Sequence, residues 1–117
     1  MFILISEYLK PVDEVDRFYA QHAAFLAKHY GSGRVLGSGR RNPPSGGIIL
    51  AKGESRREIE EIFREDPFVM NDCARYSIFE FNPNPPPRRQ PQLDDWLNAP
   101  VSGDEGGQSK GANDGDR

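Results

Sequence analysis

The chain has 117 residues, 36% of them hydrophobic, which is the size of one ordinary domain whose core needs most of the chain to contribute. The whole chain has a net charge of −3, and residues 1–83 carry eleven basic and twelve acidic groups. Because this lacks the basic excess that a phosphate backbone requires, we expect no nucleic-acid partner. The single cysteine, Cys73, excludes an internal disulfide and a zinc site of several thiolates, and it fits a reducing, cytoplasmic location.

The first predicted element is a strand at residues 2–5, a dense run of β-prone apolar residues. We expect it in the middle of a sheet, covered on both faces. Glu7 and Lys10 follow this run too soon for a signal peptide or a membrane helix to be completed. The sequence therefore predicts neither export by that route nor contact with a membrane.

A long helix is predicted from Val12 to about Tyr30. Acidic residues occupy its first turn, where the helix dipole favours anions, and Gly31 and Gly33 end it. Its apolar face repeats at helical spacing. That face consists of Val15, Phe18, Tyr19, His22, Ala23, Phe25, Leu26 and Tyr30.

Residues 34–40 and 47–52 are predicted to form an antiparallel hairpin with a long, turn-forming tip. Ser55 is a plausible N-cap of a second helix, with Glu58 at the capping-box position, and Asp66-Pro67 ends that helix. After one further turn, residues 74–81 alternate as a final strand.

The predicted order is β-α-β-β-α-β, which gives an α+β, ferredoxin-like fold with two helices on one face of a four-stranded antiparallel sheet. Apolar residues are available on both faces of the first and last strands. A monomer would expose the uncovered face, so we expect a homodimer in which two sheets form a dimeric α+β barrel.

Two residues are candidates for chemistry. His22 places an imidazole on the apolar stripe of the first helix, while His29 lies near the expected frayed end of that helix. His22 is interpreted either as a core histidine bonded to a backbone carbonyl or as a functional group that needs a partner. Asp66 is the candidate partner, and its alternative role is to cap the local turn.

Four segments in order resemble a known family over roughly residues 1–83. They are His22-Ala-Ala-Phe-Leu, Gly33-Arg-Val-Leu-Gly-Ser-Gly39, Gly46-Gly-Ile-Ile-Leu and Asp66-Pro-Phe68. Together the four are similar to the YciI-like (YCII-related) domain. The family often has Gly-Pro after the second strand, whereas here Gly39 is followed by Arg40.

The resemblance implies a dimeric α+β barrel with a His and Asp pair, here His22 and Asp66, in a pocket of each subunit. Such a pair suits acid/base proton transfer on a small organic molecule, as in an isomerase or lyase. One relative of the domain is associated with dehydrochlorination of a chlorinated hydroxyquinol. The alternative is a non-catalytic dimeric module that binds a ligand or assembles with a protein.

Ser38 and Arg40 are further candidates for the wall of the pocket. Two ligands from one subunit are too few to predict a metal site, and no cofactor is expected.

Residues 84–117 form a tail rich in proline and glycine, so the folding unit should end near Pro83 and the tail should be largely disordered. Its apolar cluster surrounds Trp96. That tryptophan is expected either to rest on the domain or its dimer mate, or to dock another protein.

Overall fold

The computed structural model describes residues 1–102. The strands β1 (Phe2–Tyr8), β2 (Val35–Arg40), β3 (Gly47–Ala51) and β4 (Ala74–Glu80) form one antiparallel sheet in the order β2-β3-β1-β4. The helices form one layer, and its first part consists of α1 (Val12–Val15), the 3-10 turn η1 (Asp16–Phe18) and α2 (Tyr19–Gly31). Its second part consists of α3 (Arg56–Phe63) and the short α4 (Pro67–Met70). The predicted ferredoxin-like fold is confirmed, with β1 in the interior of the sheet.

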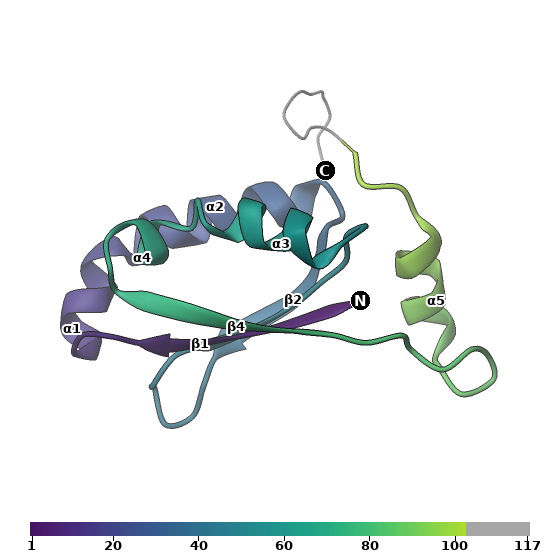
Figure 1. The fold of residues 1–117 in the computed structure, drawn as a ribbon, viewed down its shortest axis with the longest axis horizontal. Coiled ribbons are helices and arrows are strands. Elements are labelled where there is room, and N and C mark those ends of the chain that lie inside the picture. The colour runs from purple at the N-terminus through teal and green to yellow at the C-terminus, as the bar shows by residue number, and fades with distance from the viewer. Residues whose placement is uncertain (103–117) are drawn as a thin grey trace.

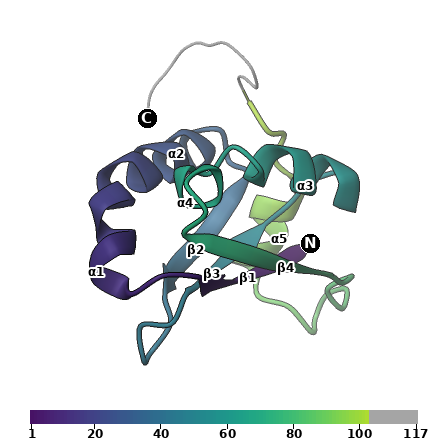
Figure 2. The same ribbon diagram turned by 60° about the vertical axis from the view of Figure 1, so that its left-hand side comes forward.

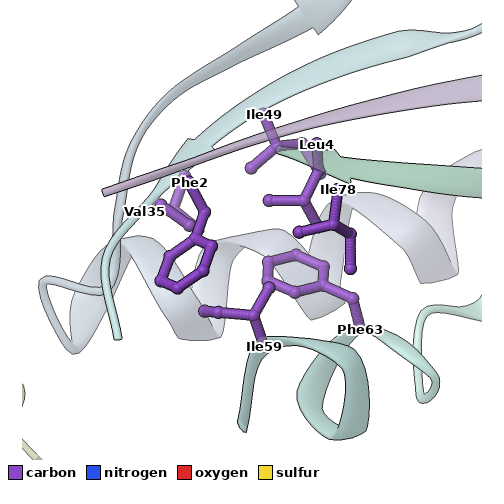
Figure 3. Close-up of a cluster of buried hydrophobic side chains, with 8 residues drawn as sticks. Phe2, Leu4, Val35, Ile49, Ile59, Phe63 and Ile78 are labelled. Carbon is purple, nitrogen blue, oxygen red and sulfur yellow. The ribbon is translucent and has the colours of Figure 1, made fainter. Parts of the chain in front are cut away.

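These helices lie together on one face of the sheet, as Figures 1 and 2 show. The hydrophobic core fills the space between the two layers (Figure 3). Phe2 and Leu4 of β1 are buried there, whereas the alternate residues Ile3 and Ile5 are only half-buried. Within one chain β1 is therefore covered on one face, and not on both as the sequence predicts, because helices α1 to α4 all pack on the same side.

The local signals at the second helix are present as predicted. Ser55 Oγ accepts a hydrogen bond from the Glu58 amide at 3.1 Å, and Glu58 Oε1 accepts one from the Glu54 amide at 2.7 Å. The expectation for His29 is wrong, because its side chain is buried against Phe25 and Phe63 and does not lie on a frayed end. Among residues 1–102, no helix combines the length and apolar character that a bilayer span requires.

The tail differs from the expectation over the residues that the structure describes, and residues 103–117 lie outside that part. Helix α5 (Pro91–Asn98) packs beside one end of the sheet, where it is drawn in light green in Figure 1. Trp96 Nε1 donates to the Gly33 carbonyl at 2.8 Å. Lys52 Nζ donates to the carbonyls of Trp96 and Ala99 and lies 5.1 Å from the indole centroid. Contacts with the body thus order a segment whose composition alone predicts disorder.

Candidate active site

The structure brings His22, on α2, next to Asp66, the residue that caps α4. Nδ1 of His22 lies 2.8 Å from Oδ1 of Asp66. Asp66 is fully buried, and the His22 side chain is 14% exposed. Because an ionised carboxylate only accepts, we assign the proton to Nδ1 of His22, which leaves Nε2 as an acceptor. No other residue of the described chain forms a hydrogen bond with the His22 ring.

The corner Asp66-Pro67-Phe68 holds this pair in place. Pro67 starts α4, and the Phe68 amide donates to Oδ1 of Asp66 at 2.9 Å. The Phe68 ring stacks on the imidazole of His22, with 4.0 Å between centroids and 6° between planes. One oxygen of Asp66 therefore serves both roles considered for it, the turn cap and the partner of His22. The core-histidine interpretation of His22 is not met, since its partner is this carboxylate and not a backbone carbonyl.

Tyr76 of β4 is a third member of the cluster, and it is not among the candidates that the sequence pattern indicates. Its hydroxyl donates to the second oxygen of Asp66, and its ring packs edge-on against Phe63 with 5.8 Å between centroids. Burial, followed by the negative charge of Asp66, raises the pKa of Tyr76 well above its usual value, so the phenol remains a donor. The sequence feature that could have indicated Tyr76 is a tyrosine on the inward face of the last strand, because a buried hydroxyl needs a hydrogen-bond partner.

A cavity of about 560 Å³ opens beside the imidazole. It combines aromatic, aliphatic and polar groups from the helices and from β1, β2, β3 and β4. Its lining consists of Tyr8, Asp16, Tyr19, His22, Leu26, Ser38, Gly39, Arg40, Gly47, Ile48, Ile49, Phe68 and Tyr76. His22 therefore faces the cavity, while the buried Asp66 lies outside the lining and contacts the site through His22 and Tyr76.

Both residues that the sequence offered for the pocket wall lie in this lining. Ser38 Oγ is 2.6 Å from the Tyr30 hydroxyl. Arg40 Nε donates to the Tyr8 hydroxyl at 3.0 Å, and its Nη2 donates to Asp16. The hydrogen bond with Asp16 is the main reason why the pKa of Arg40 is raised, so this guanidinium stays charged.

Two other groups bear on the site's chemistry. His29 is not part of the cavity lining, and burial, with smaller contributions from Lys28 and Arg34, lowers its pKa to about 4. Within residues 1–102, no three side chains of His, Cys, Asp or Glu come together as a metal site would need.

Comparison with known proteins agrees with this fold. A solved structure of 5-chloro-2-hydroxyhydroquinone dehydrochlorinase (TftG) from Burkholderia phenoliruptrix AC1100, in complex with 2,5-dihydroxybenzoquinone, superposes with a TM-score of 0.61. The two chains are 18% identical over 72% of this chain and 96% of that one. A search of curated proteins returned no match. The sequence model of the YCII-related domain matches residues 1–82, and the chain therefore belongs to the YCII-related domain family.

Proposed function

We propose that the protein is an enzyme that transfers a proton to or from a small organic molecule, in an isomerase or lyase type of reaction. His22 is the acid or base, and Asp66 is the residue that positions it. The observation that carries the proposal is the 2.8 Å contact between His22 Nδ1 and Asp66, beside a cavity that His22 lines. This contact fixes the tautomer and the orientation of the ring, so that Nε2 is the nitrogen left to meet a substrate.

The likeness to a dehydrochlorinase supports the same class of chemistry. Elimination of this kind removes a proton from carbon as the leaving group departs, and it needs one well-placed base. His22 is suited to that role because the stacked Phe68 ring and the buried Asp66 restrict its rotation.

A non-catalytic ligand-binding module is the second candidate. One observation favours it: the oxygen of Asp66 that contacts His22 also accepts from the Phe68 amide, so the pair fastens α2 to α4 whether or not it does chemistry. In that case His22 would contribute to stability and to ligand binding without transferring a proton.

Proton exchange into deuterated water tests the two candidates directly. A panel of chlorinated hydroquinones and enolisable carbonyl compounds would be incubated with the wild type and with His22→Gln, and loss of C–H signals would be followed by NMR. We expect exchange with the wild type and none above background with His22→Gln. Equal exchange rates for the two proteins would contradict the proposal.

The tautomer of His22 provides a second readout that needs no substrate. Long-range ¹H–¹⁵N correlation spectra should show Nδ1 protonated in the wild type and a mixture of tautomers in Asp66→Asn, because the amide no longer demands a donor. An unchanged tautomer in Asp66→Asn would mean that Asp66 does not position the ring.

We also propose that two copies associate through the bare face of the sheet. Ile3 lies opposite Phe79 in the sheet register, and Ile5 lies opposite Ile48, so these four side chains share that face. Phe79 is 54% exposed and Ile48 40% exposed in the single chain. Covering such a surface favours a homodimer.

Sedimentation equilibrium tests this association. The wild type should have the mass of a dimer and Phe79→Glu that of a monomer, whereas Arg57→Glu, at an exposed side chain of α3, should leave the mass unchanged. A monomeric wild type would refute the homodimer. A cytoplasmic location completes the proposal, and the single buried Cys73 is consistent with it.

A further inference from the structure

Arg40 is a cation fixed at the cavity but not used by the proton-transfer chemistry. It is the last residue of β2, and its guanidinium carbon lies 5.6 Å from the Tyr8 ring centroid and 5.7 Å from the Tyr19 ring centroid. These two rings and the hydrogen bond from Nε to the Tyr8 hydroxyl hold the guanidinium at the cavity. Within the described chain, Nη1 of Arg40 has no hydrogen-bond partner.

The partner that Arg40 does have is easily replaced. Nη2 donates to Asp16 Oδ1, and the two side chains are 35% and 45% exposed. An ion pair this exposed contributes little to stability, since water screens both charges. A guanidinium also binds planar carboxylates through two parallel N–H groups, a geometry that the single contact with Asp16 leaves unused.

The remainder of the cavity suits a flat, apolar body. Tyr8, Tyr19 and Phe68 contribute aromatic rings, and Leu26 contributes aliphatic surface. The cavity volume of about 560 Å³ lies within the range of small-molecule sites. A ligand with a planar ring and one negative group would therefore meet both the apolar walls and the cation.

We propose that Arg40 selects planar, negatively charged substrates, and that Asp16 is a built-in competitor that the substrate's anionic group displaces from the guanidinium. The inference builds on the proposed function, because it names the substrate class of the same cavity. It is tested by binding alone and needs no turnover.

Benzoate and benzamide serve as probes because they share a shape and differ in charge. Their affinities would be measured by NMR titration of the wild type, Arg40→Gln, Asp16→Asn and Asp13→Asn. Asp13 is the matched control, since it is an exposed carboxylate one turn away whose oxygen, within residues 1–102, accepts only from the Glu14 amide. Removing it changes the net charge equally without touching Arg40.

We expect the wild type to prefer benzoate and Arg40→Gln to lose that preference. Asp16→Asn should bind benzoate about two- to fivefold more tightly than Asp13→Asn does, the factor that an exposed ion pair is worth. Benzamide affinity should be the same in all four proteins.

The inference is overturned if Arg40→Gln keeps the benzoate preference, if Asp16→Asn behaves like Asp13→Asn, or if benzoate binds none of the proteins. Such a result leaves the proposed function standing when the His22-dependent proton exchange is present. Conversely, charge selection without proton exchange refutes the enzyme and retains an anion-binding module.

Discussion

Removing the hydroxyl of Tyr76 should destabilise the protein out of proportion to the one atom that is lost. In Tyr76→Phe the ring still packs against Phe63, but Oδ2 of the buried Asp66 loses its donor. A hydrogen bond to a charged group contributes about 1.5–3 kcal/mol, and the group left unpaired has no access to water. We therefore expect about 2 kcal/mol lower stability, or a melting temperature lower by roughly 10 °C for a domain of this size.

Tyr8→Phe is the matched control, because the hydroxyl it removes bonds to the partly exposed Arg40. Urea unfolding of both variants should show a loss of less than about 0.5 kcal/mol for Tyr8→Phe. The contribution of the Tyr76 hydroxyl to folding stability should also be lost at alkaline pH. Burial raises the pKa of this phenol above its unfolded value, so the unfolded chain ionises first and stability falls as pH rises beyond about 10. Equal losses in the two variants would refute the role assigned to Tyr76.

Three further predictions concern the rest of the fold. Burial lowers the pKa of His29 from 6.5 to about 4, so the unfolded chain binds a proton first as the pH drops through this interval. The free energy of unfolding should therefore fall by up to about 3 kcal/mol over the same interval. In urea titrations His29→Phe should flatten this pH dependence, and an unchanged slope would exclude His29 as its source. A Cβ at Gly46 would lie 1.8 Å from a backbone oxygen of β1, so Gly46→Ala should lower the free energy of unfolding by about 1–3 kcal/mol. Gly37→Ala should leave it almost unchanged, because a Cβ there meets open space, and equal melting temperatures of the two variants would contradict this packing. Lys52→Met removes the donor to the end of α5, so the fluorescence of Trp96 should shift to longer wavelength, and an unshifted spectrum would show that Lys52 does not hold the helix.

Much of the fold follows from local patterns in the sequence. The apolar run at Phe2 predicts an interior strand, and the Ser55 and Glu58 pair predicts where α3 begins. These features depend on short-range physics, such as strand propensity and the capping of free amide groups, which neighbouring residues determine. The pattern fails for α5 because its order comes from Lys52 and Gly33, which lie far from it along the chain.

The sequence by itself indicates candidate residues for the site, but not their contacts. These candidates are His22, Asp66, Ser38 and Arg40. Residue type and spacing show that an imidazole stands on an apolar stripe and that a carboxylate precedes a proline, but not that the two meet. The tertiary structure decided that contact, and it added Tyr76, which belongs to another strand. These groups converge because α2 and α4 lie side by side over the sheet, and the hydrogen bond between His22 and Asp66, 44 positions apart, depends on that packing.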